Sequence, residues 1–149
     1  MLDWLLPELD WYTVLGHLRD LFLAYALAVP IGWDREKRER TAGLRTFPLV
    51  AIAACGYALI GTAVLDSDAA QARLMEGLIT GIGFIGGGAI LKENTRVQGT
   101  ATAASIWSTG AIGLAVATHR IEIALLISIA TFLTLRFLKP LAQAQAASG

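Results

Sequence analysis

Cysteine, histidine and net charge are all scarce in this sequence. Cys55 is the only cysteine, which excludes an internal disulfide and any metal cluster built on thiolates. The two histidines, His17 and His119, lie far apart, and no nucleophile elbow, zinc motif or phosphate loop is present, so the sequence does not predict an enzyme. The formal net charge at pH 7 is zero, which gives no basic field for binding nucleic acid.

Charged residues of either sign are also few. They make up 16% of the chain, against about 25% in soluble domains. Hydrophobic residues reach 55%, and the mean hydropathy is +0.58. We expect no cleavable signal peptide, because acidic residues stand where its basic segment would be: Asp3, Glu8 and Asp10. The 149 residues therefore predict one domain, an all-α polytopic integral membrane protein.

Five apolar runs approach or reach the length that crosses a bilayer, which is about 20 helical residues. The predicted spans cover residues 14–33, 46–65, 74–91, 100–118 and 121–138. They form one transmembrane domain over residues 1–140, which begins with a short interfacial segment that carries Trp4, Trp11 and Tyr12. Residues 141–149 have no hydrophobic pattern and are expected to form a mobile tail.

Basic residues lie mostly on one side of the predicted spans. Three lie on the side of the N-terminus: Arg19, Arg73 and Arg120. Nine lie on the other side: Arg35, Lys37, Arg38, Arg40, Arg45, Lys92, Arg96, Arg136 and Lys139. Short loops rich in Lys and Arg stay in the cytoplasm, so we expect the N-terminus outside and the C-terminus in the cytoplasm.

The first span contains two charges, Arg19 and Asp20. A charge at bilayer depth costs about 2.5–3.5 kcal/mol, so such residues snorkel, pair or face a protein interior. Adjacent side chains on a helix point about 100° apart, so we do not expect these two to pair with each other. The simplest interpretation places both at the outer interface.

The most glycine-rich stretch runs over residues 76–92 and holds six of the 15 glycines. Gly81-x-Gly83-x-x-Gly86 matches a dinucleotide fingerprint, but the flanks are apolar and no acidic residue follows at the required spacing. The small-xxx-small spacing instead predicts a membrane helix that packs closely on a neighbour. The predicted packing glycines are Gly77, Gly81, Gly83, Gly87 and Gly88.

The fourth span carries a stripe of small and hydroxyl residues: Thr102, Ser105, Thr109 and Gly113. We expect this stripe to face the glycines of the third span, so that a tight hairpin of spans three and four forms the core. Trp107 falls in the middle of the span, and we expect it to point inward because its indole N–H needs a partner.

The candidate functional residues are charged or polar and lie near span ends: Asp34, Arg35, Glu36, Arg45, Thr46 and Glu76. The basic loop has two interpretations, a purely topological signal or a functional face at the cytoplasmic mouth of the bundle. Glu76 is either an exposed complement to the helix dipole or a site at the rim of a polar seam. Candidate metal ligands are the carboxylates that Mg²⁺ prefers, although all are near span ends: Asp20, Asp34 and Glu76.

Four motifs in order resemble the bacterial MgtC/SapB family. They cover residues 31–36, 42–46, 81–88 and 99–107, and the resemblance extends over about residues 18–138. It implies a polytopic protein of the bacterial inner membrane with about five helices. At a few positions the residue differs from the one usual in the family: Asp34, Phe47-Pro48 and Gln98.

The resemblance also implies a function. Members are linked to growth in low magnesium, to virulence and to inhibition of the proton-driven ATP synthase. We therefore predict a regulatory membrane protein that binds another membrane protein, with a cation (Mg²⁺ or H⁺) transporter or channel as the alternative. We expect a homodimer in the lipid bilayer and no cofactor, with Mg²⁺ left open. The glycine faces could serve contacts between copies as well as within one.

Overall fold

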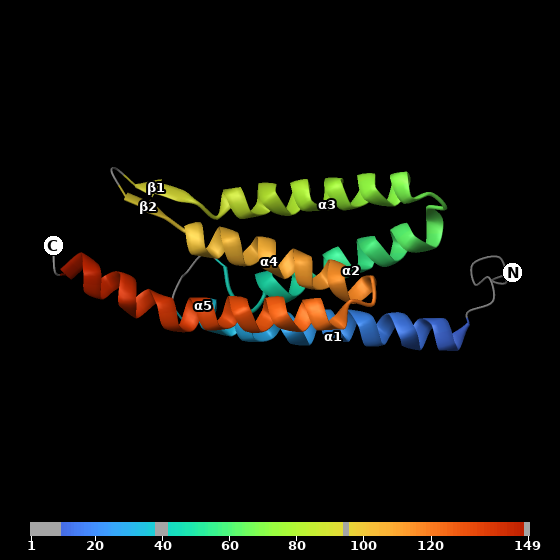
Figure 1. The fold of residues 1–149 in the computed structure, drawn as a ribbon, viewed down its shortest axis with the longest axis horizontal. Coiled ribbons are helices and arrows are strands. Elements are labelled where there is room, and N and C mark those ends of the chain that lie inside the picture. The colour runs from blue at the N-terminus through green and yellow to red at the C-terminus, as the bar shows by residue number, and fades with distance from the viewer. Residues whose placement is uncertain (1–9, 38–41, 94–95, 148–149) are drawn as a thin grey trace, which may run out of the picture.

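The computed structural model describes residues 10–37, 42–93 and 96–147, which form five helices and one short hairpin. The elements are α1 (Trp11–Glu36), α2 (Thr46–Val64), α3 (Asp68–Gly88), β1 (Leu91–Glu93), β2 (Arg96–Gln98), α4 (Thr100–Ala117) and α5 (Ile121–Ala147). The helices run up and down in turn, so the start of α1 and the end of α5 lie at opposite ends (Figure 1). Residues 1–9 of the predicted interfacial segment lie outside the described residues.

Four helices are long and apolar enough to cross a membrane: α1, α2, α4 and the part of α5 over Ile121–Leu138. Their bounds follow the predicted spans closely. The third predicted span corresponds to α3, which begins and ends earlier than expected and is not among those four. It carries Arg73 and Glu76 in its first half, and these charges lower its hydropathy.

Capping side chains fix two helix starts. The carboxylate of Asp10 accepts hydrogen bonds from the Tyr12 N–H at 3.1 Å and the Thr13 hydroxyl at 2.6 Å. The bond from the Thr13 hydroxyl is the larger cause that holds the pKa of Asp10 below its usual range. The Ser67 hydroxyl accepts from the Ala70 N–H at 3.2 Å and caps the start of α3. The predicted spans leave residues 66–73 as a connector, but α3 begins at Asp68 and includes most of them.

A β-hairpin replaces most of the loop predicted between the third and fourth spans. Its antiparallel register pairs Leu91 with Gln98 and Lys92 with Val97. Gly99 then turns the chain into α4 with φ of +85°, and a Cβ there would lie against the Ala89 carbonyl oxygen. Only glycine fits this left-handed, crowded position.

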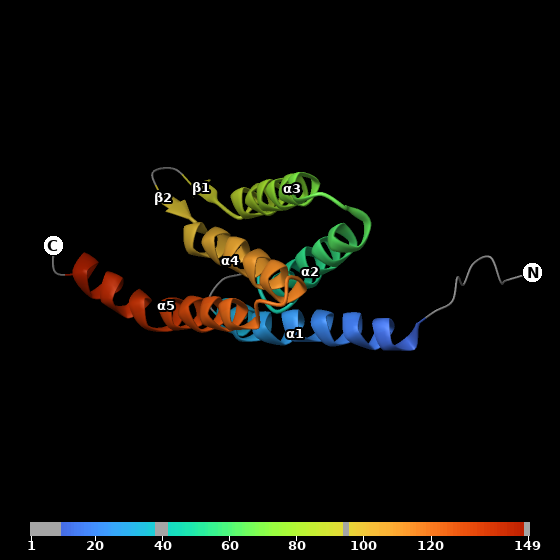
Figure 2. The same ribbon diagram turned by 45° about the vertical axis from the view of Figure 1, so that its right-hand side comes forward.

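The helices form three layers, with α2 and α4 between α3 on one side and α1 and α5 on the other (Figures 1 and 2). The middle layer supplies most of the buried apolar core, which α1 joins with small side chains. The core includes Ala24, Ala28, Ile31, Phe47, Ala51, Ala54, Cys55, Ile106, Ile112 and Val116. The bundle is therefore built around α2 and α4.

Gly113 of α4 marks the closest approach in the middle layer. A Cβ on it would collide with the Ala51 carbonyl oxygen and lie 2.9 Å from the Cys55 nitrogen, both on α2. Thr102, Ser105 and Thr109 are buried as predicted, but the Gly113 end of their stripe meets α2 rather than α3. The expectation that spans three and four form the core was wrong.

The predicted packing glycines of α3 do not pack within the chain. Added Cβ atoms on Gly77, Gly81, Gly83, Gly87 and Gly88 would meet nothing within 4 Å. The prediction was wrong because α3 lies at the edge of the bundle, where only Ile82 and Gly86 are buried. Gly86, which was not among the predicted packing glycines, does meet α4: a Cβ on it would lie 3.2 Å from the Ala103 carbonyl oxygen.

The prediction that Trp107 points into the bundle was wrong. Trp107 is half-exposed and does not point inward, because the inner faces of α2 and α4 are too close to admit an indole. The hydroxyls of Ser105 and Thr109 donate to carbonyls one turn back in their own helix, at 2.6 and 2.7 Å. Their hydrogen-bonding capacity is therefore used without a partner helix.

Small residues join α1 to α5 instead. Ala24 and Ala28 of α1, and Ala124 and Ser128 of α5, are all buried and have the small-xxx-small spacing. The Ser128 hydroxyl donates to the Leu27 carbonyl oxygen at 2.7 Å. After the predicted span ends, α5 continues to Ala147, so residues 141–147 of the expected tail are helical.

We predict that Gly113→Ala destabilises the bundle by about 1–3 kcal/mol, because the new methyl group forces α2 away from α4. Thermal unfolding in detergent micelles measures the change. The matched control is Gly56→Ala, which adds the same methyl group within α2 where nothing lies within 4 Å. Equal stability of the two variants would contradict the close approach.

Candidate functional site

Two opposite charges are buried where α1 ends. Asp34 is 4% exposed and Arg35 is 2% exposed, and the Arg35 Nη2 atom lies 3.3 Å from the Asp34 Oδ2 atom. Thr102 of α4 is also fully buried. Burying charges is unfavourable unless they are paired, so this ion pair is integral to the packing.

The Glu36 side chain connects the end of α1 to the residues that lead into α2. Its Oε2 atom accepts a hydrogen bond from the Leu44 N–H at 3.0 Å, and a Cβ on Gly43 would collide with this carboxylate. The Gly43 carbonyl then accepts from the N–H groups of Thr46 and Phe47, at 3.0 and 3.2 Å. The start of α2 is thus held against the last turn of α1.

The outward side of this corner carries aromatic and basic groups. The Lys37 Nζ atom lies 4.9 Å from the centre of the Trp33 ring, and Trp33 is 54% exposed. Arg45 is exposed as well. We call this set of residues the α1–α2 corner: Trp33, Asp34, Arg35, Glu36, Lys37 and Arg45. Thr46 stands next to it, half-buried.

Asp20 is a second buried carboxylate on α1, 2% exposed. Contrary to the sequence-based expectation, it pairs with its neighbour: the Arg19 Nε and Nη2 atoms donate to its Oδ1 atom at 2.9 and 2.7 Å. The prediction was wrong because the arginine side chain is long enough to bend toward the carboxylate, although adjacent side chains leave the helix about 100° apart. Arg19 itself stays exposed.

The three candidate metal ligands do not come together. Asp20 and Asp34 are 14 positions apart on one helix, about 21 Å. Glu76 is exposed in the first half of α3. The start of α3 and the end of α1 lie at opposite ends of the bundle (Figure 1). Within residues 10–37, 42–93 and 96–147, no three His, Cys, Asp or Glu side chains are grouped to hold a metal ion.

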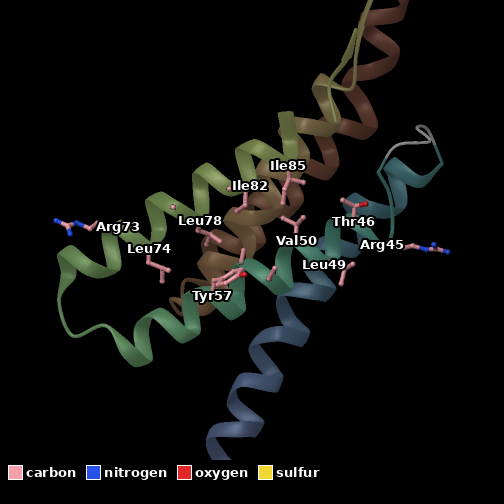
Figure 3. Close-up of a pocket in the computed structure, with 14 residues that line it drawn as sticks. Arg45, Thr46, Leu49, Val50, Tyr57, Arg73, Leu74, Leu78, Ile82 and Ile85 are labelled. Atoms are coloured by element: carbon pink, nitrogen blue, oxygen red, sulfur yellow. The ribbon is translucent and has the colours of Figure 1, made fainter. Parts of the chain in front are cut away.

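A groove of about 760 Å³ lies between α2 and α3, and no sequence pattern predicted it. Its walls are apolar along most of their length, with Arg45 at one end and Arg73 at the other (Figure 3). Gly77 and Gly81 lie in its α3 wall, so their missing side chains help to open it. We call it the α2–α3 groove.

The long apolar helices and the charges buried at helix ends define a multi-pass helical membrane protein. The MgtC family model matches residues 21–144. The chain belongs to the MgtC family, as the four motifs predicted. No solved structure matches it significantly.

Individual relatives agree with the family assignment. The chain is 35% identical over 120 residues to Protein MgtC of Brucella abortus (strain 2308), which covers 80% of this chain and 50% of that protein. It is 37% identical over 98 residues to Protein MgtC of Salmonella typhimurium (strain LT2), covering 66% and 42%. It is 34% identical over 149 residues to Protein SrpB of Synechococcus elongatus, covering 91% and 80%. The chain thus spans half or less of these two MgtC relatives.

We predict that Asp34→Ala destabilises the protein by about 3–5 kcal/mol, because it leaves the buried Arg35 guanidinium without this carboxylate. Unfolding in detergent micelles measures the loss. The control is Lys37→Ala, which removes an exposed charge three positions away. A loss no greater than that of the control would show that the ion pair does not support the corner.

Proposed function

We propose that this chain is a regulatory protein of the bacterial inner membrane that acts under magnesium limitation by binding another membrane protein. The proposal rests on membership of the MgtC family and on the α1–α2 corner. No catalytic role is proposed. By family resemblance, the proton-driven ATP synthase is the first partner to test.

The α1–α2 corner is the observation that carries the proposal. Its buried charges are bonded within the protein, at 3.3 Å between Asp34 and Arg35, so they build a fixed surface. That surface presents Trp33 and Arg45 outward. Tryptophan and arginine are the residue types that most often dominate the binding free energy of protein interfaces.

The proposed topology places this corner in the cytoplasm. The distribution of basic residues supports an N-terminus outside and a C-terminus inside. With that orientation, the hairpin of β1 and β2 also lies in the cytoplasm. A cytoplasmic corner is accessible to partners that project from the inner membrane.

A homodimer is part of the proposal. On α3, Gly83 and Gly87 are exposed on a face other than the one that lines the α2–α3 groove, and no atom crowds them. Two copies could approach there at small-xxx-small spacing. Glu76 and Thr80 lie on the same stripe by helical spacing, and the Thr80 hydroxyl donates to the Glu76 carbonyl at 2.8 Å.

Cation movement is the alternative function. The observation that favours it is the burial of two carboxylates, Asp20 and Asp34, inside a membrane bundle. Each of them is within an ion pair, and their separation along α1 supplies no shared coordination shell for Mg²⁺. We therefore favour regulation over transport.

We predict that Trp33→Ala weakens capture of a membrane partner by at least about tenfold, as expected for a hot-spot residue. Bacteria that express the chain would be grown at low magnesium, and the chain would be cross-linked to its neighbours in their membranes. The purified cross-linked products would then be probed for ATP synthase subunits. The matched control is Trp107→Ala, because Trp107 is 53% exposed but lies in the middle of α4. Partner capture that survives Trp33→Ala would contradict a role for the corner.

The transport alternative predicts flux in reconstituted liposomes loaded with a magnesium-sensitive or proton-sensitive dye. We expect no flux above that of empty liposomes, because no shared pathway of carboxylates is formed. Flux that disappears in Asp34→Asn or Glu76→Gln would overturn the regulatory proposal. The Lys37→Ala variant controls for general effects of altered charge at the end of α1.

A further inference from the structure

The α2–α3 groove has charges only at its ends. Apart from Arg45 and Arg73, its polar lining groups are Thr46 and Tyr57. The rims are open to the surroundings, since Leu49, Tyr57 and Ile85 are all exposed. In a membrane protein this groove opens toward lipid, and water does not fill an apolar surface there.

The position of Arg45 at the start of α2 matches the depth expected for lipid headgroups. The 19 residues of α2 give a helix of about 28 Å, close to the thickness of the hydrocarbon core of a bilayer. Arg45 directly precedes α2, and Arg73 lies at the opposite end of the groove (Figure 3). In the part of the chain that the structure describes, neither guanidinium has a carboxylate within ion-pair distance.

The size of the groove distinguishes between two occupants. A helix is about 10 Å across with its side chains. The groove offers about 760 Å³, which lies within the usual range for small ligands. Acyl chains, which are much thinner than a helix, fit between α2 and α3.

The Arg45 end offers the more complete headgroup site. Arg45 is followed in sequence by Thr46, a polar residue that also lines the groove, whereas Leu74 follows Arg73. An acyl chain of one leaflet extends for about half of the 30 Å core. Starting from Arg45, that length ends near Tyr57, which is 12 positions or about 18 Å along α2.

We propose that the α2–α3 groove binds an anionic phospholipid, with the phosphate on Arg45 and an acyl chain along Leu49, Ala53 and Ile85. Arginine suits this role because its planar guanidinium donates two parallel hydrogen bonds to phosphate. An added negative charge on the headgroup favours this end further, since nearby basic residues attract anionic lipid. The bound lipid would fill the space that the small residues of α3 leave open.

Native mass spectrometry of delipidated protein tests the proposal with two probes, phosphatidylglycerol and zwitterionic phosphatidylcholine. We expect preferential binding of phosphatidylglycerol, reduced about tenfold in Arg45→Ala because one charge-assisted contact is lost. Arg45→Lys should show an intermediate affinity. Arg73→Ala is the matched control and should bind like the wild type. Ala53→Trp should fill the groove and reduce binding of both lipids.

Several outcomes would overturn the lipid site. One is equal binding of phosphatidylglycerol by the wild type and Arg45→Ala. Another is unchanged lipid binding in Ala53→Trp, provided that size-exclusion chromatography shows both variants folded. Efficient disulfide cross-linking between two copies of Ala53→Cys would assign the groove to a second copy. Lipid binding should persist in Trp33→Ala, so the outcome is independent of the proposed partner function.

Discussion

The contact between Gly113 and α2 is the constraint on which the rest of the bundle depends. With the backbones of α2 and α4 in direct contact, the facing positions admit only small side chains, and Ala51 and Ala54 occupy them. The larger Trp107 side chain is exposed, although other apolar side chains of these two helices, such as Phe47 and Ile106, are buried in the core. Hydroxyls that remain inside, such as that of Thr109, satisfy themselves within their own helix. The layered arrangement follows from this one approach.

Buried charge at two levels of α1 supplies the second organising element. Asp20 and Asp34 are buried, and each has an arginine as its immediate neighbour in sequence. The two pairs differ in surroundings: Arg19 is exposed, whereas Arg35 is enclosed with its partner. The enclosed pair directly precedes Glu36, whose carboxylate accepts a hydrogen bond from the Leu44 N–H. The same few residues therefore hold the start of α2 in place and form the exposed basic surface. The proposed partner surface is therefore an outcome of packing as well as of charge.

Sequence reasoning identified the helices but not their neighbours. Uncharged runs between charged residues located α2 and α4 almost to the residue, because length and hydropathy limit a bilayer-spanning helix. The spacing of small residues permits a close approach without specifying which helix makes it. This is why the glycines of α3 misled, while the same spacing in Ala24 and Ala28 falls on the buried face of α1. The role of Arg35 as a buried residue and the α2–α3 groove depend on tertiary packing, which no local pattern encodes.

The marginal hydropathy of α3 has a consequence for biogenesis. A helix with Arg73 and Glu76 enters the hydrocarbon unfavourably by itself, by about 2.5–3.5 kcal/mol for each charge at full depth. The β1–β2 ladder brings α3 back alongside α4, where Gly86 meets the Ala103 carbonyl. Because α3 packs on α4, we expect α3 to enter the membrane stably only together with α4. The β1–β2 hairpin connects the two helices.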